Sequence, residues 1–219
     1  MIYRDLYRNY PATGEIKVPH YDTMKNWQKV LKRCFDIILS VMGMIMLSWL
    51  FIIIYIAIKL QHDGPVLFRQ ERIGKGGKPF TIYKFRTMSE NAEQYGPQLE
   101  IKNDHRLTPV GRILREHHLD ELPQLYNVLI GDMSVVGPRP ERRYFIEQIM
   151  KYDSRYQHLY EIRPGLTSEA TLHNVYPDTM EKMLKRLDRD LYYLENRTLA
   201  ADFKIITETA LSILTGKKI

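Results

Sequence analysis

The sequence contains a single cysteine, Cys34, among 219 residues. One cysteine excludes an intramolecular disulfide and any cysteine-based metal cluster within one chain. Because disulfides persist in oxidising compartments, their absence favours a reducing compartment for the soluble part of the chain. Internal repeats and low-complexity tracts are also lacking, and the content of 44% hydrophobic and 26% charged residues is typical of a globular protein. We therefore expect a folded chain without large disordered parts.

Acidic residues are outnumbered by basic ones. The chain has 32 Lys and Arg against 26 Asp and Glu, which gives a net charge of +6 and an isoelectric point near 9.2. A surface of this sign attracts an anionic partner: nucleic acid, acidic lipid or a phosphorylated substrate. Composition does not choose among the three. No nucleic-acid-binding module is recognisable, however, so we expect no nucleic acid among the partners.

One stretch has no charged residue at all. It runs for 22 positions from Ile37 to Ile58, IILSVMGMIMLSWLFIIIYIAI. At about 1.5 Å per residue, a helix of this length crosses a hydrocarbon core of about 30 Å. The stretch begins too far along the chain, is too long and lacks a following small-x-small cleavage pattern, so it is not a signal peptide. We predict that it is embedded in a membrane.

Basic residues flank this stretch on both sides: Lys25, Lys29, Lys32 and Arg33 before it, and Lys59, Arg69, Arg72, Lys75 and Lys78 after it. Under the positive-inside rule both ends lie in the cytoplasm, which one straight span does not satisfy. A helix that enters the membrane, bends and returns does satisfy it, and Ser48, close to Gly43, is the predicted bend. The alternative is a straight span followed by a basic external segment.

A β-hairpin is predicted after the membrane segment. Two apolar and aromatic runs, Val66–Ile73 and Pro79–Phe85, are separated by the glycine-rich run GKGGK at 74–78. The glycines also suggest a phosphate-binding loop, but the strand, loop and helix order of a P-loop is missing. We therefore interpret them as the turn of the hairpin.

The next segments are predicted to be helical. Thr108 followed by Pro109 is typical of a helix start, and this helix is expected to continue through Arg115. A second helix is predicted from near Asp120, with leucines on one face, and Gly131 is expected to end it.

A third helix is predicted from Glu141 to about Tyr152, after a rigid Gly-Pro-Arg-Pro turn at 137–140. Farther along, apolar residues recur at helical spacing in two stripes, which predict helices that pack on the core. The second stripe, from Leu199 to Leu214, is followed by two lysines and is also suited to a membrane surface.

Asp120 and Glu121 are the candidate chemical centre. At the start of a helix, free backbone N–H groups and the helix dipole stabilise negative charge, so Asp120 is expected to stay ionised, as a nucleophile must. Two adjacent carboxylates are usually held by arginines or by a divalent metal, and all-oxygen ligation completed by substrate phosphates is typical of Mg²⁺. The alternative is that the pair only caps the helix, which is the commoner role.

Basic residues that could bind a diphosphate beside this pair are Lys84, Arg86, Arg115 and Arg139. Arginines suit bidentate contact with phosphate, and Arg139 is held stiffly between two prolines. The adjacent histidines His117 and His118 are not expected to be metal ligands, because neighbouring residues on a helix point in different directions.

Four motifs follow one another along the chain: KRCFDIILS, DGPVLFRQERIGKGGKPFTIYKFRTM, NDHRLTPVGRILREHHLDELPQLYNVLIGDMSVVGPRPE and RPGLT. In this order they resemble the bacterial sugar transferase family, the small monotopic polyprenyl-phosphate phosphoglycosyl transferases, over about residues 31–215. The resemblance implies a predominantly α fold with a small β-hairpin. It also implies an N-terminal membrane-embedded, re-entrant helix and a catalytic domain on the cytoplasmic face with interfacial amphipathic helices.

The resemblance further implies a two-step reaction. Asp120 would attack the sugar-bearing phosphorus of a nucleotide diphospho-sugar, expelling UMP, and polyprenyl phosphate would then take the phosphosugar from the carboxylate. Glu121 would help to hold Mg²⁺. The residues that match substrate-binding positions are Arg115 and Arg139, and, more weakly, Lys84, Arg86 and Glu141.

On this basis the chain is divided into an extension at 1–24, a membrane-associated helix-break-helix at 25–60 and a catalytic domain at 61–219. The expected partners are a UDP-sugar, polyprenyl phosphate and membrane lipid. Downstream glycosyltransferases and a homodimer are further partners left open. The expected location is the bacterial inner membrane, with the catalytic domain on its cytoplasmic face.

Two features depart from the family pattern. The family breaks its re-entrant helix with Ser-Pro, whereas this chain has Ser48-Trp49, so the kink of a proline is missing. After RPGLT the family continues with Gly-Trp-Ala-Gln, whereas SEAT follows here at 168–171, which indicates a subfamily. A membrane-tethered scaffold without catalysis is the rival interpretation, but it predicts a damaged dyad or basic cluster, and both are intact.

Overall fold

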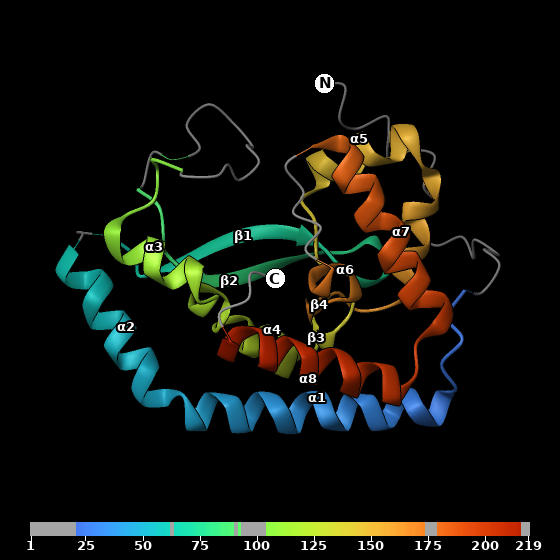
Figure 1. Cartoon of the computed structure of the whole chain (residues 1–219), viewed down its shortest axis with the longest axis horizontal. Helices are drawn as coiled ribbons and strands as arrows, with labels where there is room; N and C mark the ends of the chain where they lie inside the picture. The colour runs from blue at the N-terminus through green and yellow to red at the C-terminus, as the bar shows by residue number, and fades with distance from the viewer. Residues whose placement is uncertain (1–20, 62–63, 90–91, 93–103, 174–178, 216–219) are drawn as a thin grey trace.

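The computed structural model describes residues 21–61, 64–89, 92, 104–173 and 179–215. A long helix with a bent continuation forms one side of the molecule, and the β-hairpin and the other helices lie on it (Figure 1). The helices are α1 (Asn26–Met46), α2 (Ser48–Gln61), α3 (Pro109–Glu116), α4 (Gln124–Ile130), α5 (Arg143–Tyr152), α6 (Glu169–Leu172), α7 (Met180–Asn196) and α8 (Leu199–Thr215). The strands are β1 (Leu67–Ile73), β2 (Pro79–Phe85), β3 (Ser134–Val136) and β4 (Gly165–Thr167). Short 3₁₀ segments are η2 (Lys75–Gly77), η3 (Leu119–Glu121) and η4 (Ser154–Glu161).

The helices α1 and α2 meet at an angle of 60°. The break falls at Leu47, immediately before the predicted bend at Ser48, and it forms without a proline. One straight helix over this stretch is therefore excluded. Taken singly, none of the described helices combines the length and hydropathy needed to cross a membrane, whereas α1 and α2 meet both criteria as a bent pair.

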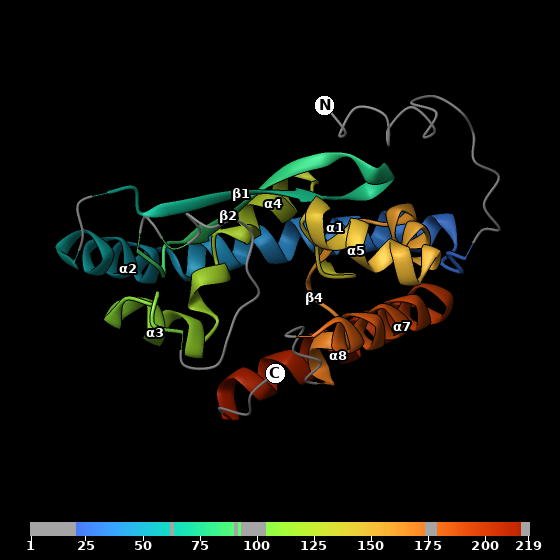
Figure 2. The ribbon, with the colours of Figure 1, turned by 90° about the horizontal axis from the view of Figure 1, so that it is seen from above.

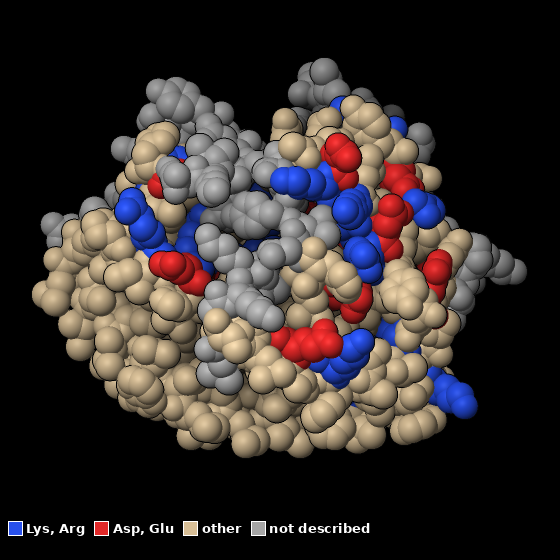
Figure 3. Space-filling model, viewed as in Figure 1, with Lys and Arg blue, Asp and Glu red and all other residues tan. Residues whose placement is uncertain are grey.

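Apolar side chains cover the outer face of this pair. Val30, Ile45, Trp49 and Ile52 each expose 60% or more of their surface. In the space-filling view, the rim over α2 and the adjoining part of α1 carries neither blue nor red side chains (Figure 3). A continuous apolar face of this kind marks an interaction surface, and its composition suits lipid.

The inner face of α1 is polar and buried. Lys32 Nζ lies 2.7 Å from an Asp202 oxygen on α8. One helical turn on, Asp36 Oδ1 accepts hydrogen bonds from the Ser134 hydroxyl at 3.1 Å and from the Val135 N–H at 2.9 Å. These contacts join α1 to both β3 and α8, so the helix pair is an integral part of the fold.

The predicted extension ends in contact with the folded part. Met24 is only 2% exposed, and the Asp22 carboxylate accepts from Arg197 Nε at 2.7 Å and pairs with Lys29 Nζ at 2.7 Å. Residues 1–20 of the predicted extension lie outside the described residues.

The predicted hairpin is confirmed. Strands β1 and β2 pair antiparallel, with Arg69 opposite Tyr83, and glycines at 74–77 form the connection. Gly76 and Gly77 have φ values of 70° and 68°, which are costly for residues with a Cβ atom. The turn of the hairpin therefore explains why these positions are glycines. A small apolar cluster below the hairpin joins it to α2 and α3: Ile54, Ile58, Val66, Phe85 and Leu114.

The first predicted helix start is also confirmed. The Thr108 side chain accepts the Gly111 N–H at 2.9 Å, and Pro109 is the first residue of α3. The helix α3 ends at Glu116, one residue beyond the predicted Arg115.

The predicted starts of the next two helices are wrong by a few residues. The helix α4 begins at Gln124, because Pro123 occupies its N-cap, and Asp120 lies before it in η3. The helix α5 begins at Arg143 and not at Glu141, whose carbonyl accepts the Ile73 N–H at 3.1 Å and so belongs to the turn beside β1.

A second, parallel pair of strands was not predicted, so the expected fold with one hairpin is incomplete. Ser134 of β3 pairs with Gly165 of β4, and Val136 pairs with Thr167. The strands approach each other so closely that a Cβ atom on Gly165 would lie 2.1 Å from the Gly137 nitrogen. Strands of three residues are too short to show a period of two in the sequence.

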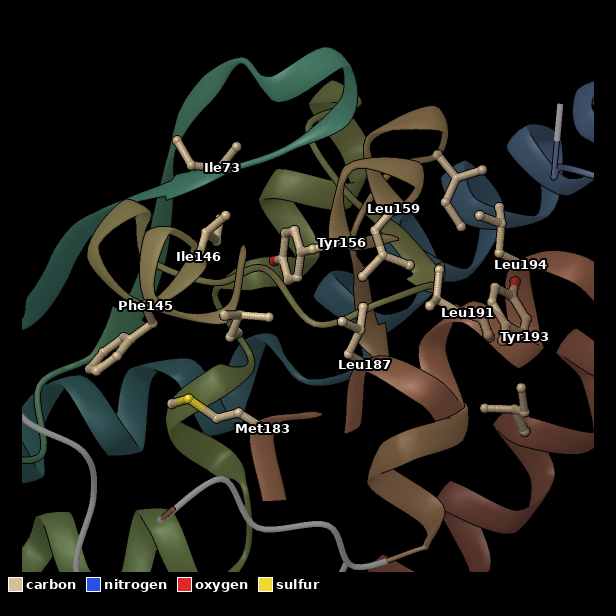
Figure 4. Close-up of a cluster of buried hydrophobic side chains, with 14 residues drawn as sticks. Ile73, Phe145, Ile146, Tyr156, Leu159, Met183, Leu187, Leu191, Tyr193 and Leu194 are labelled. Atoms are coloured by element: carbon tan, nitrogen blue, oxygen red, sulfur yellow. The ribbon is translucent and has the colours of Figure 1, made fainter. Parts of the chain in front are cut away.

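The main core lies between α5, η4 and α7. Met183, Leu187 and Leu191 of α7 face Tyr156 and Leu159 of η4 (Figure 4). The first apolar stripe predicted in the C-terminal part is therefore core packing, as expected.

The second stripe packs differently. On α8, Ile205 is 2% exposed, whereas Phe203 and Leu211 are 72% and 55% exposed. The prediction of core packing is therefore wrong for Phe203 and Leu211, because α8 lies at the edge of the fold (Figure 2).

We expect Asp202→Ala to lower the free energy of unfolding by about 3–5 kcal/mol, because it leaves the buried Lys32 ammonium without its partner. Glu208→Ala is the matched control on the same helix, since Glu208 pairs only with the exposed Lys204 at 3.8 Å, and a change below about 0.5 kcal/mol is expected. Denaturant unfolding in the same detergent compares them. Equally small changes would show that the Lys32–Asp202 pair does not hold α8 on α1.

Candidate active site

The candidate nucleophile Asp120 lies in η3, just before α4. It is 5% exposed, and within the described part of the chain its carboxylate has no hydrogen-bond partner. It therefore caps neither η3 nor α4, and the capping alternative is excluded. His118, the residue before η3, has a φ of 53°, an uncommon backbone conformation for a residue with a side chain.

Glu121 is held by two cations from distant segments. Lys84 Nζ, near the end of β2, lies 2.5 Å from Glu121 Oε1, and Arg139 Nη2 lies 2.8 Å from the same oxygen. The second oxygen, Oε2, has only a 3.5 Å contact with Arg139 Nη1. Burial alone would raise the pKa of Glu121, but Arg139 and Lys84 hold that pKa well below its usual value. Glu121 is thus a fixed negative charge.

Asp120 has the opposite electrostatic character. Burial raises the pKa of its carboxyl group, Glu121 adds to the rise, and Lys84, Arg115 and Arg139 oppose it. We expected the N-terminus of a helix to keep Asp120 ionised. This expectation is wrong, because no α-helix starts at this residue. Nearby cations are what favour its charged form.

Arg115 and Arg86 have different surroundings. Arg115 Nε donates to the Thr87 hydroxyl at 3.0 Å, and its charge acts on Asp120. Arg86 follows β2, is half-buried, and its backbone N–H donates to the Val66 carbonyl at 2.9 Å. Two other predicted residues, Lys84 and Arg139, meet at Glu121.

Glu141 turns away from the dyad. Its carboxylate lies 3.4 Å from Arg72 Nη1 and 3.5 Å from Arg186 Nη1. Glu141 therefore contacts Arg72, which also donates to the Pro140 carbonyl of the turn.

Asn127 is a site residue that sequence reasoning missed. It is fully buried on α4, where its Oδ1 accepts the Tyr83 N–H at 3.2 Å and its Nδ2 donates to the Thr81 carbonyl at 2.7 Å. The side-chain amide thus binds the edge of β2 as a neighbouring strand would. This contact sets Lys84 on β2 beside the dyad that precedes α4. The available signal was a polar residue within the apolar run QLYNVLI.

The residues at this centre fit Mg²⁺. Two adjacent carboxylates supply hard oxygen ligands, and Mg²⁺ usually binds one or two carboxylates together with substrate phosphates and water. Glu121 Oε2 and the Asp120 oxygens retain lone pairs for such a ligand. No cluster of three or more acidic, histidine or cysteine ligands occurs among the described residues, so the substrate would have to complete the shell.

The sequence profile of the bacterial sugar transferase family matches residues 27–216. The chain belongs to this family. The match includes both helices of the bent pair, the hairpin, the dyad and the Pro-Arg-Pro turn, and it confirms the resemblance seen in the motifs.

Curated relatives carry related names. A UDP-N-acetylgalactosamine-undecaprenyl-phosphate N-acetylgalactosaminephosphotransferase of Aeromonas hydrophila is 37% identical over 93% of this chain and 50% of its own length. A UDP-glucose:undecaprenyl-phosphate glucose-1-phosphate transferase of Klebsiella pneumoniae is 41% identical over 91% of this chain and 43% of its own. An exopolysaccharide production protein of Rhizobium leguminosarum is 40% identical over 86% of this chain and 98% of its own. The chain thus spans about half the length of the first two.

Isosteric substitutions of the two carboxylates are expected to change stability in opposite directions at neutral pH. Asp120→Asn removes a charge that burial disfavours, so the free energy of unfolding is expected to rise by about 0.5–2 kcal/mol. Glu121→Gln removes the counter-charge of Lys84 and Arg139, so the free energy of unfolding is expected to fall by more than about 1 kcal/mol.

Denaturant unfolding without divalent metal measures both changes. Because its pKa is lowered on folding, Glu121 stabilises the fold above the usual carboxyl value of 4.5, and this contribution is lost as the pH falls through the folded value. Shifts of the same sign in the two variants would contradict the assigned charges.

Proposed function

We propose that the chain transfers a sugar 1-phosphate from a UDP-sugar to undecaprenyl phosphate through a covalent intermediate on Asp120. The observation that carries the proposal is a buried carboxylate with no hydrogen-bond partner among the described residues, beside a carboxylate fixed by two cations. A purely structural aspartate at this depth would be hydrogen-bonded. Membership of the bacterial sugar transferase family and the names of the relatives support the reaction class.

In the first step, an Asp120 oxygen attacks the phosphorus that bears the sugar. The new bond joins carboxylate oxygen to phosphorus, the bond to the bridging oxygen of the diphosphate breaks, and UMP leaves with the electron pair. Lys84, Arg115 and Arg139 surround the carboxylate with positive charge, which favours its ionised form and the approach of a diphosphate. Glu121 holds Lys84 and Arg139 in place for this role.

In the second step, a phosphate oxygen of undecaprenyl phosphate attacks the same phosphorus. The bond to Asp120 breaks, the carboxylate is restored, and undecaprenyl diphospho-sugar is the product. Because the transfer is divided in two, nucleotide and lipid do not need to occupy the site together. The site therefore needs only one cationic pocket for phosphate groups.

Mg²⁺ would be held by the carboxylates of Glu121 and Asp120 together with the substrate diphosphate, and would neutralise the charge of the phosphates. Removal of divalent metal is expected to stop UMP release, and added Mg²⁺ to restore it.

The bent helix pair is proposed to enter the cytoplasmic leaflet of the bacterial inner membrane and return. Its outer face is apolar, and the catalytic part lies on its polar inner face. In the proposed arrangement the dyad would lie on the side of the membrane where the nucleotide sugar is made, within reach of a lipid phosphate.

The relatives favour UDP-N-acetylgalactosamine and UDP-glucose as the donors to test first. The proposed pathway is the first membrane step of a surface glycan such as an exopolysaccharide, capsule, O-antigen or glycoprotein glycan, and the Rhizobium relative favours exopolysaccharide.

A panel of UDP-sugars, incubated with the purified full chain, Mg²⁺ and undecaprenyl phosphate, tests the proposal by release of UMP. We expect UMP with at least one donor, and a loss of more than about a thousandfold in Asp120→Asn, because the amide is not a nucleophile. Asp188→Asn is the matched control on exposed α7 surface and is expected to keep native activity. Folded protein that releases UMP from no donor would overturn the proposal in favour of a scaffold.

A further inference from the structure

The Pro-Arg-Pro turn at 138–140 is supported from behind by α7, which no motif of the sequence singled out. Proline has no N–H group, so within this turn the only backbone donor belongs to Arg139. The buried carboxylate of Asp190 on α7 lines the same small cavity as Arg139 and lies close enough to this N–H to interact with it. Burial raises the pKa of Asp190 to about 7, with the Arg186 charge opposing the rise. An ionisable group this deep in a core is costly, and retaining one suggests a task beyond packing.

The remaining peptide groups of the turn are held as well. The Pro138 carbonyl accepts the Gly165 N–H at 2.8 Å, and the Pro140 carbonyl accepts from Arg72 Nη1 at 3.0 Å. Arg72 belongs to β1. The prolines on either side of Arg139 are therefore held by residues of two elements, β4 and β1.

Arg186 completes the support one helical turn before Asp190. Its Nη1 lies 3.5 Å from Glu141 Oε1, while Arg72 Nη1 lies 3.4 Å from Glu141 Oε2. The Glu141 carboxylate is thus held between one arginine from α7 and one from β1. Because Glu141 directly follows Pro140, this contact fixes the end of the turn as the Asp190 contact fixes its middle.

These groups lie behind the site and not in it. Arg139, Glu141, Arg186 and Asp190 line a cavity of about 10 Å³, which is room for about one water molecule. No part of a nucleotide sugar fits there, so Asp190 and Arg186 do not touch the substrate. The Arg139 side chain itself reaches the site, where its Nη2 lies 2.8 Å from Glu121 Oε1.

We infer that Asp190 and Arg186 are positioning residues that fix the backbone of Arg139, so that its guanidinium meets both Glu121 and the diphosphate of the substrate. The role at the diphosphate rests on the proposed function. The role on the backbone does not, because it follows from contacts within the chain. A bidentate grip on phosphate requires the guanidinium to be oriented before the ligand arrives.

Amide hydrogen exchange tests the backbone role without any substrate. A peptide that spans 138–140 reports a single amide, that of Arg139, because its neighbours are prolines. In Asp190→Ala we expect this amide to exchange at least about tenfold faster, since its charged acceptor is gone. In Asp190→Asn, which keeps an acceptor oxygen, we expect a smaller increase. Met183→Leu, which alters the same cavity from α7 with little change of volume, is expected to leave the amide unchanged.

Binding of UDP to the full chain in detergent with Mg²⁺ tests the role at the site. We expect Asp190→Ala to raise the Kd of UDP about tenfold in the native background and less than twofold in an Arg139→Ala background, because its effect passes through Arg139. Thermal unfolding of each variant separates loss of fold from loss of position.

The outcomes are distinguishable. Unchanged exchange at Arg139 in Asp190→Ala would overturn the inference, as would an equal rise in the Kd of UDP in both backgrounds. Faster exchange together with native protein that binds no UDP would uphold the positioning role and overturn the proposed function instead.

Discussion

The two ion pairs of Glu121 are the interaction on which the site depends. They draw together Lys84 from the hairpin, the turn before α4 and Arg139 from the Pro-Arg-Pro turn, three segments that are separated along the chain. Without this shared anion, two cations would lie close together with only the Asp120 carboxyl group, whose pKa burial raises, to balance them. The pairs also divide the work of the dyad. The negative charge of Glu121 is paired with the two cations, whereas the buried carboxylate of Asp120 makes no hydrogen bond among the described residues.

Each of these three segments is in turn anchored to a rigid element. Asn127 attaches the edge of β2 to α4, and Arg33 of α1 donates to the Val128 and Leu129 carbonyls at the other end of α4 at 2.6 and 2.8 Å. The long helix α1 therefore contacts the same short helix that follows the dyad. Under the proposed function, this contact would give the site a fixed position relative to the bilayer.

Features that depend on local chemistry could be predicted from the sequence. The hairpin follows from its glycines, α3 from Thr108 and Pro109, and the bend from basic flanks on both sides of an apolar run. Among the site residues, Lys84, Glu121 and Arg139 do meet, as their charges suggested.

Features that depend on distant contacts could not be predicted. The pairing of β3 with β4 joins two runs of three residues, and Asp190 reaches Arg139 across a separation of about fifty residues through one backbone N–H. Neither leaves a period or a motif in the chain. The start of α4 was misplaced for a smaller reason, because a proline at 123 is compatible with a helix that starts on either side of it.

Mass spectrometry of the intact protein tests the central claim most directly, that Asp120 carries the phosphosugar. The purified chain is incubated with Mg²⁺ and a UDP-sugar in the absence of undecaprenyl phosphate, and the modified peptide is then mapped. The account predicts one sugar-phosphate adduct on the peptide that contains Asp120, and its loss when undecaprenyl phosphate is added. UMP release that occurs only with the lipid present and leaves no adduct, or an adduct that persists in Asp120→Asn, would contradict it.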